Sequence, residues 1–210
     1  MKPEVFTIKK ERSALIVVDM QNDFVREGGA LEVPDARERI PAVKKLITAF
    51  HNIERPVIFT RFIAGPERTL IWGWSPQIAP PTRCCWRGVT RYYADIAAER
   101  ECISIIDELP VRSVDYIVDK YGYSAFHNTQ LEDILKANAV EIVVVCGAAM
   151  PVCVNETVCG AFARNFRVVV AEDATASFTP QFREYSLQLF AFKYGRVVSV
   201  DKILKELKRE

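Results

Sequence analysis

Six short apolar runs rich in β-branched residues recur along the chain, and they constrain its fold more than any other feature. They occupy residues 14–18, 56–60, 114–118, 141–146, 167–171 and 196–200. A strand buried on both faces is apolar throughout, whereas a strand with one solvated face alternates apolar and polar residues. The runs therefore predict the strands of a parallel sheet.

The segments between these runs have the spacing of amphipathic helices. Apolar residues recur at intervals of three and four in residues 41–52, 126–138, 151–165, 180–194 and 201–209. Pro151 and Pro180 stand where a first helical turn tolerates proline, and Gly195 is a predicted C-cap. The alternation predicts an α/β fold: a three-layer αβα, doubly wound, predominantly parallel six-stranded sheet.

Length and composition favour one domain. The 210 residues, of which 50% are hydrophobic, suffice for one well-buried core, so a single domain over residues 1–210 is expected. Residues 62–110 differ from the rest, because they hold Trp72-Gly73-Trp74, Pro80-Pro81 and paired cysteines without a sustained period. A long aromatic loop of this kind predicts an insert that shapes a substrate pocket.

Charge and cysteine usage exclude several classes of function. Lys and Arg number 28 against 27 Asp and Glu, and this balance does not indicate nucleic acid or an anionic membrane as a partner. We find no signal-peptide core or membrane-length apolar run and expect a cytoplasmic protein. Without a C-x-x-C motif the six cysteines are expected to be reduced, with Cys146 and Cys159 in the core and Cys84 and Cys85 left open.

Three chemically capable residues stand at or just beyond the ends of apolar runs. Asp19 follows the first run, Lys120 lies two residues beyond the third, and Cys153 follows the fourth after a turn of small residues. Because the carboxyl ends of parallel strands meet at one edge of a sheet, we expect these side chains to converge there.

Each of the three has a structural alternative. An Asp after a strand often caps a turn, a lone Lys is usually a surface charge, and a Cys is usually a small buried apolar residue. Cys153, however, stands at the start of a predicted helix, where free N–H groups lower a thiol's pKa and stabilise an oxyanion. Lys120 in a half-buried aromatic turn needs a carboxylate partner, which Asp19 can supply. We therefore predict a catalytic trio.

The motifs around the trio resemble those of a known family. They are the segments 14–24 (ALIVVDMQNDF), 120–126 (KYGYSAF), 153–157 (CVNET) and 172–175 (EDAT). In this order they resemble the isochorismatase-like cysteine hydrolases, which include nicotinamidase, N-carbamoylsarcosine amidohydrolase, biuret hydrolase and ureidoacrylate amidohydrolase. The resemblance implies cleavage of a small amide or N-carbamoyl/ureido C–N bond through a thioester. Cys153 would be the nucleophile, Asp19 the proton shuttle and Lys120 its electrostatic partner.

The resemblance also implies how the substrate is held. A cis peptide between Ala148 and Ala149 would aim the N–H groups of Ala149 and Cys153 at the oxyanion, and the protein would be a homodimer or homotetramer. The candidates for the pocket wall are Phe24, Trp72, Trp74, Tyr123 and Phe126. Any of these aromatic side chains could instead pack over a neighbouring subunit. Candidates for binding a substrate carboxylate are Arg61, Arg83, Arg87 and Arg91.

Two departures from the family pattern bear on the substrate. Met150 stands where the family usually has Thr, which changes the pocket wall. The insert contains no His, and the chain's two histidines, His51 and His127, lack partners at metal-ligand spacing, so we predict neither metal nor cofactor and disfavour nicotinamidase. Two alternatives stay open: an isochorismatase-type vinyl-ether hydrolase, which does not need the thiol, and a non-catalytic binding or assembly protein that keeps the fold.

Overall fold

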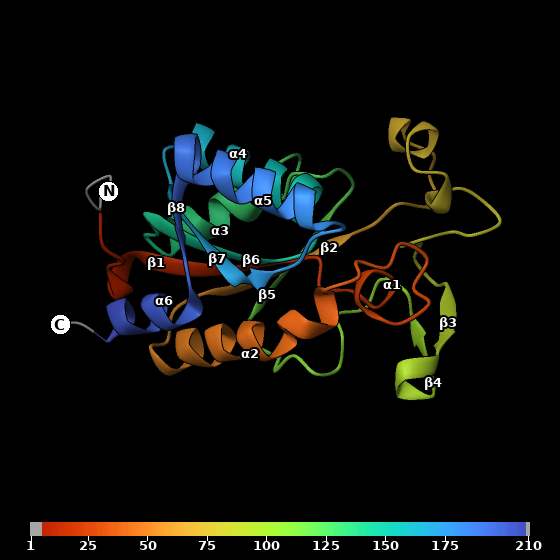
Figure 1. The fold of residues 1–210 in the computed structure, drawn as a ribbon, viewed down its shortest axis with the longest axis horizontal. Coiled ribbons are helices and arrows are strands. Elements are labelled where there is room, and N and C mark those ends of the chain that lie inside the picture. Colours follow the sequence, from red (N-terminus) through yellow and green to blue (C-terminus); the bar gives the residue numbers. More distant parts are fainter. Residues whose placement is uncertain (1–5, 209–210) are drawn as a thin grey trace.

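A six-stranded parallel sheet forms the centre of the computed structural model, which describes residues 6–208 (Figure 1). The strand order is β5-β2-β1-β6-β7-β8. The strands are β1 (Ser13–Val18), β2 (Val57–Phe62), β5 (Tyr116–Lys120), β6 (Ile142–Gly147), β7 (Arg167–Thr175) and β8 (Gly195–Val198). The predicted α/β class is confirmed, including the parallel sheet of six strands.

Helices cover both faces of this sheet (Figure 1). On one face lie α2 (Ala36–Asn52) and α6 (Val200–Leu207); on the other lie α3 (Leu131–Ala137), α4 (Asn155–Ala163) and α5 (Pro180–Leu189). Leu15 and Val17 of β1 point into the core under α2, whereas Ile16 and Val18 point into the core under α3 and α4. Because neighbouring side chains enter different cores, the strand is apolar throughout. No helix in the described part of the chain is long and apolar enough to span a membrane.

The chain between β2 and β5 leaves the sheet at its carboxyl end and forms a separate lobe (Figure 1). It contains an antiparallel hairpin of β3 (Thr90–Tyr93) and β4 (Ala98–Glu101). The sequence reading predicted no regular structure here, because both strands mix charged with apolar residues and are mostly solvated. A short helix, α1 (Asn22–Val25), joins the end of β1 to this lobe.

Several predicted boundaries are wrong, and the first of them bears on the site. β5 lies two residues later than predicted, so Lys120 is its last residue and pairs with Phe62 of β2. The predicted helix at 126–138 begins only at Leu131, because Ala125 and Phe126 are buried in the preceding turn. The helix predicted from 151 opens instead with a π-helical turn, Met150–Val154.

Of two single-residue predictions on the C-terminal half, the C-cap is confirmed and the core cysteine is wrong. Gly195 is the C-cap of the π-helical turn Phe190–Tyr194, as predicted, and its N–H donates to the carbonyl oxygen of Phe190. Its backbone is extended, so it also begins β8, where a Cβ would lie 2.3 Å from the carbonyl oxygen of Val168. Cys159 is half-buried on α4 rather than a core residue. Helix α6 begins at Val200, and Arg209, its predicted end, lies outside the described residues.

Gly147 provides a test of how tightly the carboxyl ends of β1 and β6 pack. Its φ is +106°, and a Cβ would lie 2.2 Å from the carbonyl oxygen of Val18. Gly147→Ala should lower the free energy of unfolding by at least about 3 kcal/mol, since backbone strain and a backbone clash add. Urea denaturation measures the loss.

The matched control is Gly28→Ala, where φ is +75° and nothing lies within 4 Å of the added Cβ. This variant carries the backbone strain alone, about 1–2 kcal/mol. Equal losses in the two variants would contradict the close approach of Gly147 to β1.

Candidate active site

The structure brings Asp19, Lys120 and Cys153 together at the carboxyl edge of the sheet. Asp19 follows β1, Lys120 ends β5, and Cys153 lies in the π-helical turn after β6. Nζ of Lys120 is 2.8 Å from Oδ2 of Asp19, and both side chains are fully buried. The Cys153 thiol lies close enough to both that the charge of Lys120 lowers its pKa and the charge of Asp19 raises it. An acid, a cation and a thiol thus meet as the sequence predicted, while their catalytic roles remain a proposal.

The surroundings of Lys120 favour its charged form. Nζ donates hydrogen bonds to the carbonyl oxygens of Gly122 and Tyr123, each at 3.0 Å, and lies 5.0 Å from the ring centre of Phe62. Burial is the largest single effect and lowers the pKa of Lys120, but Asp19 and Cys153 together raise it more, so the pKa lies above its ordinary value. The ammonium is a permanent charge beside the carboxylate at neutral pH.

Cys153 differs from the expectation for a thiol at a helix start. Burial, opposed by the charge of Lys120 and reinforced by that of Asp19, raises the pKa of Cys153 to about 12. The predicted lowering is therefore wrong, because loss of hydration outweighs the lowering by the Lys120 charge. The resting sulfur is a neutral thiol, and it needs a base at the moment of attack.

A turn of small residues connects β6 to Cys153. The peptide between Ala148 and Ala149 is cis, as the resemblance implied. The N–H of Ala148 donates to Val18 and that of Met150 to Ala176, whereas the N–H of Ala149 has no hydrogen-bond acceptor among residues 6–208. Ala149 and Cys153 are 8% and 6% exposed, while Asp19 and Lys120 are at 0%. A ligand therefore reaches the trio from the side of the sulfur and this turn.

Comparison with known proteins agrees with this geometry. The family model of the isochorismatase domain matches residues 13–202. The chain belongs to the isochorismatase family. It is 31% identical to the ureidoacrylate amidohydrolase RutB of Yersinia enterocolitica, over 95% of this chain and 91% of that protein.

Two solved structures of the family are similar over almost the whole fold. A cysteine hydrolase from Pseudomonas syringae pv. phaseolicola 1448A has a TM-score of 0.86 at 28% identity, covering 99% of this chain and 98% of its own. An N-carbamoylsarcosine amidase from Thermoplasma acidophilum has a TM-score of 0.74 at 30% identity, covering 90% and 97%. The predicted membership of the isochorismatase-like superfamily is confirmed.

The five predicted pocket aromatics are not gathered in one place. The ring of Phe62 lies directly beneath the Lys120 ammonium. The rings of Phe24 and Tyr123 flank Phe62, with their centres 6.3 and 6.2 Å from its centre. Phe126 stacks instead on Phe166 in the core under α4. Trp72 stacks on Trp86 within the lobe, and Trp74 is 82% exposed. Phe24 and Tyr123 are thus connected to the trio through the ring of Phe62, whereas Phe126 shares a buried cluster with Cys153.

The arginines predicted to bind a substrate carboxylate have partners of their own. Arg61 and Arg87 both contact Asp119, at 2.7 and 2.6 Å, and Arg91 contacts Asp23 at 2.8 Å. Arg83 lies over the ring of Trp86. A substrate carboxylate would have to compete with these contacts.

Gln21 joins the catalytic edge to the lobe and was missed by the sequence reading. Its side chain accepts a hydrogen bond from the Phe62 amide (2.6 Å) and donates to the carbonyl oxygens of Phe62 (3.0 Å) and Ile103 (3.1 Å). Gln21, two positions after Asp19, thereby holds both ends of the lobe: the point where the chain leaves β2 and the point at Ile103 where it returns. A buried amide directly after an apolar strand was the available signal.

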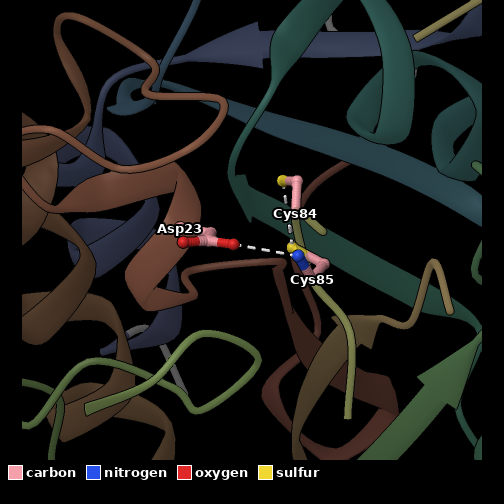
Figure 2. Close-up of side chains that lie close together, drawn as sticks. All are labelled: Asp23, Cys84 and Cys85. Atoms are coloured by element: carbon pink, nitrogen blue, oxygen red, sulfur yellow. Dashed lines mark hydrogen bonds between the residues drawn. The ribbon is translucent and has the colours of Figure 1, made fainter. Parts of the chain in front are cut away.

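Asp23 holds the middle of the same lobe (Figure 2). Its carboxylate accepts hydrogen bonds from the Cys85 amide (2.9 Å), the Arg91 guanidinium (2.8 Å) and the Tyr93 hydroxyl (2.8 Å). Cys84 and Cys85 are free thiols beside it, with their sulfurs 3.7 Å apart.

These three side chains are also a group that could hold a metal ion, since their ligand atoms lie within 4.8 Å of one another. The surroundings do not fit a cation. Arg91 already neutralises Asp23, and burial raises the pKa of Cys85 well above its ordinary value, so the thiol keeps its proton. We interpret Asp23, Cys84 and Cys85 as a structural anchor of the lobe.

Replacing Lys120 tests the buried ion pair. Lys120→Met leaves the Asp19 carboxylate buried without its cation, which should lower the free energy of unfolding by about 3–5 kcal/mol in urea denaturation. Because the folded pKa of Lys120 is raised above its ordinary 10.5, the wild-type advantage is complete below that pH and is lost only as pH rises through the folded value.

Lys136→Met is the matched control for this substitution. Lys136 is 66% exposed and pairs with Glu132 on the same helix, so its loss should change stability by less than about 0.5 kcal/mol. Equal losses in the free energy of unfolding of the two variants would contradict the expected contribution of the Asp19–Lys120 pair to stability.

Asp23→Asn tests the anchor of the lobe. The substitution removes the charge opposite Arg91 and should lower stability by about 2–3 kcal/mol, because hydrogen bonds to a buried carboxylate are lost. Limited trypsin digestion followed by mass spectrometry should show faster cleavage within residues 62–110 than in the wild type. Asp107→Asn, which removes a 57% exposed carboxylate of the same region, should digest like the wild type.

Proposed function

We propose that this protein is a cysteine-dependent amidohydrolase that cleaves a small amide or N-carbamoyl/ureido C–N bond through a thioester intermediate. The observation that carries the proposal is the buried Asp19–Lys120 pair, whose two charges both act on the Cys153 thiol. The broader class rests on the relatives: a hydrolase acting on C–N bonds other than peptide bonds.

The first half of the reaction follows from the neutral thiol. As the sulfur of Cys153 attacks the substrate carbonyl carbon, its proton passes to the Asp19 carboxylate, and the carbonyl oxygen becomes an oxyanion. The N–H groups of Ala149 and Cys153 stabilise that oxyanion. Asp19 then gives the proton to the leaving nitrogen, the C–N bond breaks, and a thioester on Cys153 remains.

The second half reuses the same carboxylate. Asp19 takes a proton from a water molecule, whose oxygen attacks the thioester carbon. The C–S bond breaks, the product acid or carbamate leaves, and the sulfur recovers the proton from Asp19. Lys120 keeps its charge throughout and lies 2.8 Å from Asp19, where it offsets the negative charge that the site carries during each proton transfer.

Features of the chain favour a small carbamoyl or ureido compound as the substrate. Two relatives named for carbamoyl or ureido substrates are a ureidoacrylate amidohydrolase and an N-carbamoylsarcosine amidase. Cys153 is only 6% exposed, which suits a narrow ligand. The ring of Phe62 lies under Lys120 and is flanked by the rings of Phe24 and Tyr123.

We also propose that the protein acts as a homodimer or homotetramer. Large apolar side chains on and around α4 and α5 are about half-exposed in a single copy of the chain. They are Phe162, Phe182, Tyr185 and Phe192. Association of two copies would remove this apolar surface from water.

Ammonia release from N-carbamoyl amino acids, ureido acids and simple amides tests the proposed reaction. The wild type should turn over at least one compound of this set, and Cys153→Ala should lower kcat by about 10³-fold or more, since the nucleophile is lost. Cys159→Ala, which removes a half-buried thiol on α4, should retain wild-type turnover.

A trapped intermediate makes the test specific. With a slowly hydrolysed amide, mass spectrometry should find the acyl group on the peptide that contains Cys153. Full turnover by Cys153→Ala would contradict the thioester route and favour the vinyl-ether hydrolase. A wild type inactive on the whole set would favour a binding or assembly protein.

A further inference from the structure

We infer that Thr60 is a positioning residue for the catalytic carboxylate: its hydroxyl fixes Asp19 so that one oxygen is held and the other is left to exchange the proton. The role of Thr60 rests on the proposed function, because that function makes Asp19 the catalytic base. The hydrogen bonds between Thr60 and Asp19 do not depend on it. The sequence reading took Thr60 only as the last residue of an apolar strand.

The hydrogen bonds between Thr60 and Asp19 are reciprocal. The Asp19 amide donates to Oγ1 of Thr60 at 3.1 Å, and Oγ1 donates to Oδ1 of Asp19 at 2.5 Å. A hydroxyl carries one proton, and an oxygen that accepts from an amide still has that proton to give. The carboxylate is the acceptor present, so the direction of this bond is fixed.

These bonds act on a residue with an uncommon backbone. Asp19 has a φ of 46°, in the left-handed region that few non-glycine residues adopt. Thr60 lies on β2 beside β1 and is fully buried, so it contacts Asp19 from a rigid neighbouring strand rather than from a loop. Both the backbone and the side chain of Asp19 are thereby tied to the sheet.

The two carboxylate oxygens consequently have different surroundings. Oδ1 is occupied by the Thr60 hydroxyl. Oδ2 lies 2.8 Å from the Lys120 ammonium but, among residues 6–208, accepts no hydrogen bond of normal geometry. Oδ2 is the oxygen with capacity to receive a proton, and Thr60 holds the carboxylate in the rotation that presents it.

A structural role is the competing explanation. A buried hydroxyl needs a partner wherever it lies, so Thr60 could bond Asp19 merely to satisfy itself. The two explanations differ in which part of the side chain matters. Positioning requires the hydroxyl, whereas packing in the strand requires the methyl group and the β-branched shape.

Thr60→Val and Thr60→Ser separate these parts. The first keeps the shape and loses the hydroxyl, and the second keeps the hydroxyl and loses the methyl. We expect Thr60→Val to lower kcat by about 10- to 100-fold with KM changed less than about twofold, and Thr60→Ser to stay within about threefold of wild-type kcat. A fully active Thr60→Val beside an impaired Thr60→Ser would overturn the inference.

Alkylation of Cys153 gives a readout that needs no substrate. The rate of iodoacetamide labelling at pH 7.5, followed by mass spectrometry of the Cys153 peptide, reports how well the base next to the neutral thiol is placed. Thr60→Val should slow this labelling several-fold, and Thr60→Ser should not. Labelling at the wild-type rate in both variants would overturn the inference.

The two assays together distinguish this inference from the proposed function. If the wild type hydrolyses none of the tested amides while Thr60→Val still slows labelling, the proposed function fails and the positioning role stands. If the wild type turns over its substrate and Thr60→Val equals it in both assays, only the positioning role fails. Should Thr60→Val not fold, Thr60→Ala against Thr60→Ser isolates the same hydroxyl.

Discussion

The buried ion pair between Asp19 and Lys120 is the interaction on which the rest of the site depends. Removing two charges from water costs several kcal/mol each, and their attraction offsets this only when the remaining polar atoms also find partners. Here the partners come from the edge of the sheet: Thr60 of β2 on one side, and the carbonyl oxygens of Gly122 and Tyr123 on the other. The face of Phe62 closes the ammonium off from solvent. A buried ion pair with this many partners is better explained by a chemical role than by a contribution to stability, because apolar residues would fill the same space at a lower free-energy cost.

The same burial determines how the thiol is used. In a solvated site beside a lysine, Cys153 would rest as a thiolate, whereas here burial keeps its proton in place. The carboxylate that raises the pKa of the thiol is also the base that can remove its proton. Holding the sulfur neutral until a substrate carbonyl arrives protects a buried cysteine from reactions with other electrophiles. In the proposed mechanism, Asp19 and Lys120 therefore control the timing of the nucleophile as well as its reactivity.

The sequence contained enough to predict the sheet and the trio, but not what holds the trio in place. Apolar runs such as 14–18 identify strands because both faces are buried, and Asp19, Lys120 and Cys153 stand out because each is a reactive residue at the end of a run. Thr60 and Gln21 do not stand out, since their role depends on the parallel register of β2 with β1 and β5. The direction of the Cys153 pKa was missed for a related reason: helix position is visible in a sequence, but depth of burial is not. The hairpin of β3 and β4 was missed because a solvated strand carries little periodic signal.

The stretch from Asp19 to Asp23 links catalysis to the segment predicted to shape the pocket. Asp19 faces the thiol, Gln21 holds the two ends of the lobe, and Asp23 holds its middle through Arg91 and Tyr93. The anchors of the lobe therefore lie within four residues of the carboxylate that moves the proton in the proposed mechanism. Positions away from these anchors, such as the exposed Leu70 and Trp74, are free of that constraint. Specificity can change at such positions with little effect on the chemistry, whereas a change at Gln21 or Asp23 alters both. This division gives a physical reason why one hydrolytic core can serve different small substrates.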